Sequence, residues 1–186
     1  MSVSLVLVRE PGYCRVPLFE KSGLRVLFTT RRFDMAFGGR GRPAAYKALG
    51  LDPARLVCSS QVHSDHIFVI DKKHGGRGAR QRETAIQDND ALITASPGIP
   101  ISVLTADCLP VILWSRAPRV AAVVHAGWRG TRDRIIAKTL EKMARQCGVS
   151  SKNVMAILGP SIRSCCYEVG REFLGHFIPG ILLRAL

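Results

Sequence analysis

Three short polar segments interrupt otherwise apolar stretches of the sequence: QVHS at 61–64, TADC at 105–108 and VHAGWRG at 124–130. Each segment contributes one side chain that binds soft or borderline metal ions, namely His63, Cys108 and His125. Two imidazoles and one thiolate suit Zn²⁺, and three protein ligands with a fourth position left to water are typical of a catalytic zinc site. The sequence therefore predicts zinc chemistry, provided that the fold brings the three segments together.

Other interpretations of the same residues stay open. The separations along the chain are far from those of a zinc finger, a histidine after an apolar strand is often satisfied inside the core, and a single cysteine is often a small apolar filler. A metal-free enzyme is a further alternative, in which Cys108 is a thiolate nucleophile activated by His125. Such cysteine and histidine pairs suit deamidation and acyl transfer.

Two charged residues lie next to these candidate ligands. Asp107 precedes Cys108, and a carboxylate there can orient a metal-bound histidine or take protons from water, although it can equally cap a turn. Arg129 follows His125 and can hold an anionic oxygen with two hydrogen bonds, or else form a surface ion pair. Both residues are candidates for catalysis.

The elements that must position these residues alternate between strands and helices. Runs of β-branched residues at 101–105, 111–114 and 120–124 predict buried strands that meet at polar turns. From residue 131 apolar residues recur with a helical period up to Gly148, which predicts a helix packed on the sheet. Further expected elements are strands at 24–30, 67–70, 90–94 and 154–158, a helix at 43–49, an exposed mobile loop at 72–83 and a helix from Ser164 through Phe177.

Composition sets the class of protein. The 186 residues, 47% of them hydrophobic and 22% charged, predict one globular α/β domain over 1–186, with a mixed β-sheet core flanked by helices. The formal net charge of +13 favours anionic partners, and few aromatics and no recognition motif in the basic stretches argue against nucleic acid. No apolar stretch is long enough to cross a membrane, no secretory signal is evident, and the six cysteines are unevenly spaced, so we expect a cytoplasmic protein with free thiols.

Longer segments around the three polar islands resemble a known family. QVH at 61–63, DALIT at 90–94, TADCLPVIL at 105–113, VAAVVHAGWRGT at 120–131 and GPSIRSCCYEVG at 159–170 are similar to the YfiH/laccase-domain family, whose members are also called multicopper polyphenol oxidoreductases or purine nucleoside phosphorylases. The similar segments are long, occur in the family's order and lie within residues 56–175.

The resemblance implies a YfiH/CNF1-like α/β domain and a specific site. Its zinc ligands would be His63, Cys108 and His125, its catalytic residues Cys108, His125, Asp107 and Arg129, and its substrate-binding residues Arg31, Arg32 and Gln61. The implied activity is phosphate-dependent cleavage of adenosine, inosine and methylthioadenosine, with adenosine deamination as a side activity. Copper-dependent phenol oxidation fits less well, because one cysteine and two histidines cannot supply the ligands of several coppers.

The sequence also departs from the family pattern. Its N-terminal FTTRRFDMAFGG keeps only an arginine, at 31 or 32, and the Gly38–Gly39 pair of the usual block, and Ser64 stands where a glycine usually follows the histidine. Family members continue past the position of Leu186, so the C-terminal part of the usual domain is expected to be missing. The missing strands would expose a sheet edge, which would promote self-association. A non-enzymatic alternative is a shortened chain that keeps the fold and binds nucleosides without turnover.

Overall fold

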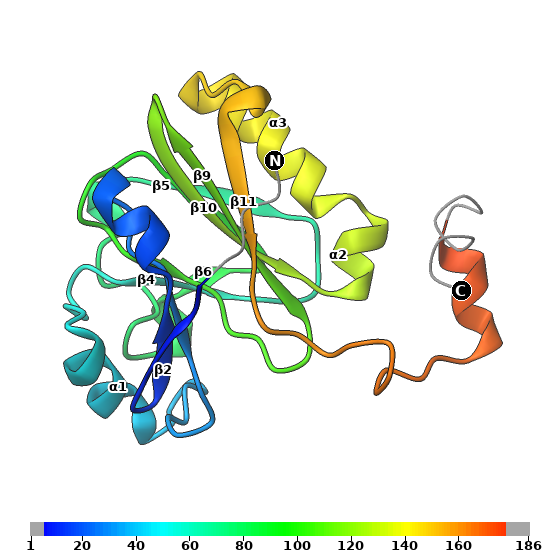
Figure 1. Ribbon diagram of the computed structural model, residues 1–186, viewed down its shortest axis with the longest axis horizontal. Coiled ribbons are helices and arrows are strands. Elements are labelled where there is room, and N and C mark those ends of the chain that lie inside the picture. The colour runs from blue at the N-terminus through cyan, green and yellow to red at the C-terminus, as the bar shows by residue number, and fades with distance from the viewer. Residues whose placement is uncertain (1–5, 178–186) are drawn as a thin grey trace.

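The computed structural model describes residues 6–177, and within them the strands form three sheets (Figure 1). An N-terminal antiparallel sheet has the order β1 (Val8–Glu10), β2 (Tyr13–Arg15), β3 (Leu27–Thr29). The central sheet has the order β11 (Val154–Leu158), β9 (Leu109–Arg116), β10 (Arg119–Ala126), β7 (Ala91–Thr94), β5 (Ile67–Ile70). A small parallel sheet has the order β6 (Ile86–Gln87), β4 (Val57–Ser60), β8 (Ile101–Ser102).

The central sheet is mixed, because β5 and β7 pair in parallel while the other neighbours are antiparallel. The helices are α1 (Gly41–Leu49), α2 (Trp128–Arg132) and α3 (Ile135–Cys147). Short 3-10 helices lie at Pro17–Ser22, Lys72–His74, Arg82–Thr84, Ser151–Asn153 and Arg171–His176. No helix among residues 6–177 is long and apolar enough to span a membrane.

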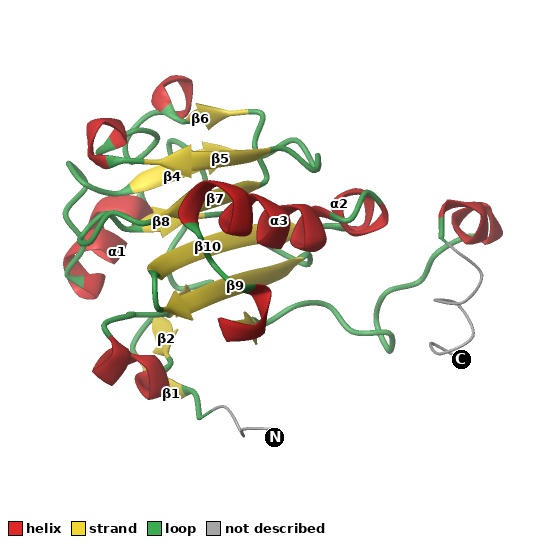
Figure 2. Cartoon of the chain, turned by 90° about the horizontal axis from the view of Figure 1, so that it is seen from above, coloured by secondary structure: helices red, strands yellow, loops and turns green. Residues whose placement is uncertain are grey.

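Strand alternation places the two faces of β10 in different layers. Ala122 and Val124 point to one face, where they join the core cluster that contains Ile135 and Met143 of α3. Val123 points the other way and packs in the cluster formed with the small parallel sheet. Figure 2 shows α3 lying along one face of the central sheet. The hairpin that carries the candidate ligands is therefore buried on both sides, which fixes its register.

The segment between β2 and β3 packs on β9 and β11 of the central sheet. Trp114 of β9 and Ile157 of β11 are buried against Val16, Phe19 and Val26, which come from the first 26 residues of the chain. Because these contacts join segments far apart in sequence, they hold β11 in place beside β9.

The structure confirms the mixed α/β architecture and differs from the expected elements in three places. The helix predicted from 131 is broken at Arg134, whose φ of 63° is left-handed, so that α2 and α3 are separate. The helix predicted from Ser164 is wrong: residues 164–166 form a turn, and only Arg171–His176 is a 3-10 helix. The Pro179–Gly180 pair that was expected to end this helix lies outside the described residues.

The loop expected to be exposed at 72–83 is exposed at Lys72, Lys73 and residues 80–83, but its middle is buried. Arg42 of α1 is buried and donates hydrogen bonds to the carbonyl oxygens of Gly78 and Ala79, and Ala79 itself is buried. The aromatic hydroxyl of Tyr46 donates to the same Ala79 carbonyl. A loop without apolar periodicity is thus ordered by side chains from another element, a contact that periodicity cannot reveal.

Candidate metal centre and pocket

Strand register brings Cys108 and His125 together. In the β9–β10 hairpin Leu109 pairs with Ala126 and Pro110 with His125, so the residue just before β9 lies beside the end of β10. His63 lies in the turn before β5. This strand pairs with β7, which neighbours β10 on the side away from β9. The nitrogen and sulfur atoms of His63, Cys108 and His125 all lie within 4.8 Å of one another. The structure thus gathers the three predicted ligands at one end of the central sheet.

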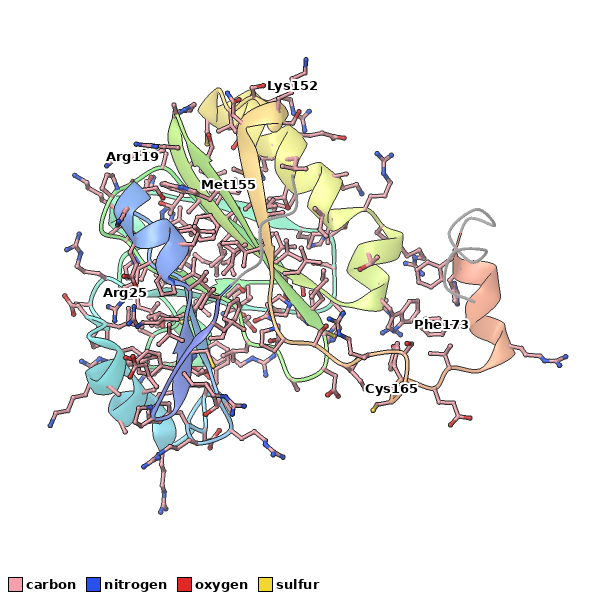
Figure 3. The ribbon with its side chains drawn as sticks, viewed as in Figure 1. Arg25, Arg119, Lys152, Met155, Cys165 and Phe173 are labelled. Atoms are coloured by element: carbon pink, nitrogen blue, oxygen red, sulfur yellow. The ribbon has the colours of Figure 1, made fainter. Side chains whose placement is uncertain are left out.

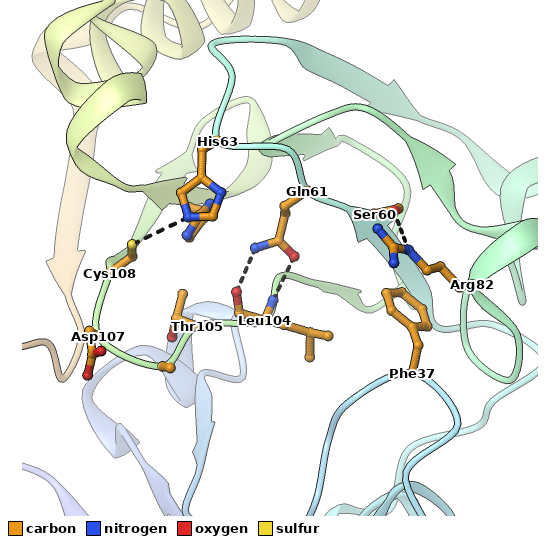
Figure 4. Close-up of a pocket in the computed structure, with 11 residues that line it drawn as sticks. Phe37, Ser60, Gln61, His63, Arg82, Leu104, Thr105, Asp107 and Cys108 are labelled. Carbon is orange, nitrogen blue, oxygen red and sulfur yellow. Dashed lines mark hydrogen bonds between the residues drawn. The ribbon is translucent and has the colours of Figure 1, made fainter.

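The distances suit a single metal ion. Cys108 Sγ is 3.9 Å from His63 Nε2, and the ring centroids of His63 and His125 are 4.7 Å apart (Figure 4). Typical Zn–S and Zn–N bonds of about 2.3 Å and about 2.1 Å add up to more than the 3.9 Å separation. One ion can therefore bind both atoms. Among residues 6–177 this is the one group of three or more histidine, cysteine or acidic side chains arranged closely enough for a metal.

Asp90 is the residue that sequence analysis missed. Its side chain is completely buried, and its Oδ1 lies 2.7 Å from His125 Nδ1. Burial opposes ionisation, but hydrogen bonds from His125, Ser64 and Val62 outweigh that effect and lower the pKa of Asp90 to about 2. An ionised carboxylate only accepts, so Nδ1 of His125 carries the proton and Nε2 keeps its lone pair for a metal.

The same carboxylate shapes the turn that carries His63. It accepts hydrogen bonds from the main-chain N–H groups of Val62, His63 and Ser64, and from the Ser64 hydroxyl. His63 has a left-handed φ of 62°, which is an uncommon conformation for a residue with a side chain. One buried anion therefore orients two candidate ligands, one through its ring and the other through its backbone.

Gly127 has no side chain at the point where the three candidate ligands meet. A Cβ atom at this position would lie 3.0 Å from His63 Cδ2 and 3.2 Å from Cys108 Sγ. Its φ of −70° is accessible to any residue, so the constraint is contact with the ligands and not backbone strain.

The three ligands line one end of a pocket with a volume of about 380 Å³. Its lining comprises Phe37, Ser60, Gln61, His63, Arg82, Leu104, Thr105, Ala106, Asp107, Cys108 and His125. Figure 4 shows Cys108 and His63 at one end, Arg82 and Phe37 at the other, and Gln61 between them. A pocket of this size suits a small-molecule ligand.

Gln61 lines the pocket, but its amide is already engaged. Its side-chain nitrogen donates to the Leu104 carbonyl at 2.6 Å, and its side-chain oxygen accepts from the Leu104 N–H at 2.9 Å. This reciprocal pair joins the segment after β4 to the segment after β8. The predicted substrate contact from Gln61 remains a prediction, and the structure adds a positioning role.

Of the other predicted site residues, one lines the pocket and three do not. Asp107 is exposed and lines the pocket beside Cys108. Arg129 is exposed, stacks on the Trp128 ring at 4.3 Å and is not part of the lining. Arg31 and Arg32 are exposed and also stand outside the lining. Their roles stay predictions, whereas Phe37 and Arg82, which sequence analysis did not select, do line the pocket.

The surroundings of Cys108 favour a metal ligand over a free nucleophile. Burial raises the pKa of the Cys108 thiol, and the negative charges of Asp107 and Asp90 raise it further. An activated cysteine nucleophile needs the opposite, a cationic neighbour that lowers its pKa. A bound cation would supply the missing positive charge.

Segment 171–176 packs on the outside of α2. The Phe173 ring lies 4.5 Å from the Trp128 ring, and Figure 3 shows Phe173 on the side facing that helix. Cys165 and Cys166 are exposed in the connection that leads there, and their sulfur atoms are 3.3 Å apart. The main-chain N–H of Ile162 donates to the Asp107 carbonyl, which joins this connection to the loop that carries Cys108.

Comparison with known proteins agrees with the resemblance seen in the sequence. The chain is 42% identical over 129 residues to "Adenosine deaminase RL5" from an unknown prokaryotic organism, covering 69% of this chain and 49% of that protein. It is 38% identical over 125 residues to "Purine nucleoside phosphorylase" from Bacteroides thetaiotaomicron, covering 67% and 46%. The chain thus spans about half the length of the curated relatives it matches.

A solved structure shares the fold. YlmD from Geobacillus stearothermophilus superposes with a TM-score of 0.84 at 23% identity, covering 93% of this chain and 71% of that one. Residues 39–181 match the family described as multi-copper polyphenol oxidoreductase laccase. That match covers most of the chain and includes all three candidate ligands, so the chain belongs to the multi-copper polyphenol oxidoreductase laccase family.

Proposed function

We propose that this chain carries a zinc-dependent purine nucleoside phosphorylase site, with adenosine deamination as a second activity. The observation that carries the proposal is the His63, Cys108 and His125 group beside the buried Asp90 in a pocket of small-molecule size. The names of the two relatives, one a phosphorylase and one a deaminase, supply the substrate class. The metal and the substrates are our inference from these observations.

The donor set fits Zn²⁺ better than several coppers. Nitrogen and sulfur ligands are those that zinc prefers, and a carboxylate bound to a ligating histidine is a common feature of zinc sites. When bound, Zn²⁺ supplies Lewis acidity and lowers the pKa of water, so that a nucleophile is available at neutral pH. A thiol ligand also has to stay reduced, which is consistent with a cytoplasmic location.

The chain's own residues would prepare the site for both reactions. Asp90 keeps the proton of His125 on Nδ1 and holds His63 through its backbone. Asp107 lies at the metal end of the pocket, where its carboxylate can accept a proton from water and return it to a leaving group. In deamination, water adds at C6 of the purine and ammonia leaves, so one proton of the water moves to the departing amine and the other ends on N1 of the product.

Phosphorolysis breaks a different bond. An oxygen of hydrogenphosphate attacks C1′ of the ribose, the N9–C1′ bond breaks, and its electron pair leaves with the purine. The proton lost by the phosphate balances the proton gained by the purine. The pocket walls would hold phosphate and nucleoside in contact, which is the main contribution a protein makes to such a displacement.

Product analysis tests the proposal. Zinc-loaded protein would be incubated with adenosine, with and without inorganic phosphate. We expect adenine and ribose 1-phosphate only with phosphate, and inosine with ammonia in both cases. Cys108→Ser is the matched control and is expected to lose both reactions. A folded, zinc-loaded protein that forms none of these products would refute the proposed function and favour an inactive nucleoside-binding remnant.

The metal-free cysteine hydrolase remains the second interpretation of the same residues. It predicts fast alkylation of Cys108 by iodoacetamide, whereas a thiolate bound to zinc would react slowly until a chelator is added. Mass spectrometry of the alkylated protein before and after chelation distinguishes the two. The raised pKa of the Cys108 thiol is the reason we favour the metal-dependent alternative.

A further inference from the structure

Arg82 is the one Lys or Arg side chain that lines the pocket in the part of the chain that the structure describes. It begins the 3-10 helix Arg82–Thr84, and its Nε donates to the hydroxyl of Ser60 at 3.0 Å. Ser60 is buried at the end of β4. The guanidinium is therefore tethered to the sheet at one point, although the residue itself is exposed.

The rest of the guanidinium remains available. Within residues 6–177, Nη1 and Nη2 of Arg82 make no hydrogen bond and no ion pair. By contrast, the neighbouring Arg77 donates to the carbonyl oxygens of Thr84 and Ala85. Figure 4 shows the Arg82 guanidinium beside Phe37, at the end of the pocket away from Cys108. Two parallel N–H donors facing a pocket match the oxygens of a phosphate.

Charge separates the two ends of this pocket. The metal end has the carboxylates of Asp90 and Asp107 and the thiolate of Cys108, so a divalent ion bound there would still leave a net negative charge. The Arg82 end has a positive charge and no carboxylate in its lining. A dianion in the pocket is therefore attracted to Arg82 and repelled by the metal end.

We propose that Arg82 binds the phosphate co-substrate, with the nucleoside lying between it and the metal ligands; this inference rests on the proposed function. C6 and N9 lie at opposite ends of a purine. If C6 faces the metal ligands for deamination, the N9–C1′ bond points toward Arg82 without any change of orientation. One binding mode then serves both reactions, and phosphate held by Arg82 attacks C1′ in the balanced displacement given above.

The two reactions provide the test, because only one of them uses phosphate. In zinc-loaded Arg82→Gln we expect kcat/KM for phosphate in phosphorolysis to fall by about ten- to a hundred-fold, the loss of charge-assisted hydrogen bonds. Deamination without phosphate should fall far less than phosphorolysis, because it uses no phosphate. Arg82→Lys keeps the charge but not the planar fork, so its phosphorolysis should lie between those of the other two proteins.

Arg80→Gln is the matched control, because Arg80 is exposed in the same segment and does not line the pocket. It should leave both reactions unchanged. Isothermal titration with inorganic phosphate adds a readout apart from catalysis, and Arg82→Gln should bind phosphate at least about ten-fold more weakly than the wild type.

Each outcome has a distinct meaning. Unchanged phosphate dependence in Arg82→Gln, or equal loss of deamination and phosphorolysis, would overturn the phosphate assignment while leaving the proposed function intact. A wild-type protein with neither activity would refute the proposed function. In that case the titration alone would still decide the assignment, which is supported by weaker phosphate binding in Arg82→Gln and overturned by equal binding.

Discussion

Asp90 and His125 form a buried pair in which the carboxylate Oδ1 lies 2.7 Å from Nδ1 of the imidazole. The side chains are 0% and 4% exposed, and the same carboxylate receives three main-chain N–H groups from the turn that carries His63. The candidate metal centre is therefore organised around an anion that is not one of the three candidate ligands.

Asp90→Asn should weaken zinc binding while leaving the three candidate ligands in the sequence. The amide cannot hold His125 as an ionised acceptor does, and loss of such a partner usually costs about ten- to a hundred-fold in metal affinity. Competition with a chromophoric chelator measures this affinity. Asp88→Asn is the control, because Asp88 is exposed and contributes its carbonyl, not its carboxylate, to His66. Equal affinities of the Asp90→Asn variant and the wild type would contradict the role of Asp90.

The same carboxylate should make the stability of the metal-free protein depend on pH. The pKa of Asp90 is lowered to about 2 when folded, against about 3.9 in an unfolded chain. Ionised Asp90 therefore stabilises the fold fully above pH about 4, and this contribution is lost as the pH falls toward about 2. Its size is about 2–3 kcal/mol in the free energy of unfolding.

Urea unfolding of the metal-free wild type and Asp90→Asn at several pH values checks this dependence. The difference in unfolding free energy between the two proteins should shrink steadily below pH about 4. A difference that stays constant from neutral pH down to pH about 2 would mean that Asp90 has an ordinary pKa in the folded protein.

Gly127→Ala should impair the candidate metal site through direct contact with its side chains. The added methyl would lie 3.0 Å from the His63 ring and 3.2 Å from Cys108 Sγ, so the ligands have to move apart. The backbone conformation suits alanine, so overpacking by the methyl is the main cost to the metal-free protein, about 1–3 kcal/mol in the free energy of unfolding. Zinc affinity should fall by about ten-fold. Gly175→Ala is the control, since a Cβ there meets nothing within 4 Å, and equal zinc affinity in both variants would refute this steric account.

Gln61→Ala should lower the free energy of unfolding, and not only weaken substrate binding. The amide makes a reciprocal pair of hydrogen bonds with the main chain of Leu104, and their loss should cost about 1–3 kcal/mol in unfolding free energy. A residue that only contacts substrate would instead raise KM without changing stability. Chemical denaturation and steady-state kinetics on the same preparation separate these outcomes, and unchanged stability would show that the hydrogen bonds to Leu104 contribute little.

Residue types, strand periodicity and the family resemblance were enough to predict the central strands and the three side chains that the fold gathers at one end of the sheet. His63, Cys108 and His125 have the chemistry of zinc ligands, and the β-branched runs around them form β9 and β10. Asp90 could not be identified in this way, because its role depends on strand register: the main-chain N–H of His125 donates to the Asp90 carbonyl, which places the two side chains together. Periodicity carries no information on such cross-strand neighbours.

The sequence could not predict which arginine lines the pocket, for a related reason. Arg129 is close to His125 in sequence, yet its side chain stacks on Trp128 outside the pocket lining. Arg82 is distant in sequence and reaches the pocket only because Arg42 and Ser60 fix the segment around it. Long, flexible side chains are positioned by tertiary contacts, so neighbourhood in sequence is a poor guide to which cation faces a ligand.

The most direct test of this account is the metal content of the folded protein, purified without added metal and measured by elemental analysis beside Cys108→Ala. The account predicts about one zinc per wild-type chain and almost none in the variant, because the thiolate is one of three protein ligands. A folded wild-type protein without zinc, or a variant that retains it fully, would contradict the assignment of His63, Cys108 and His125 as a metal centre.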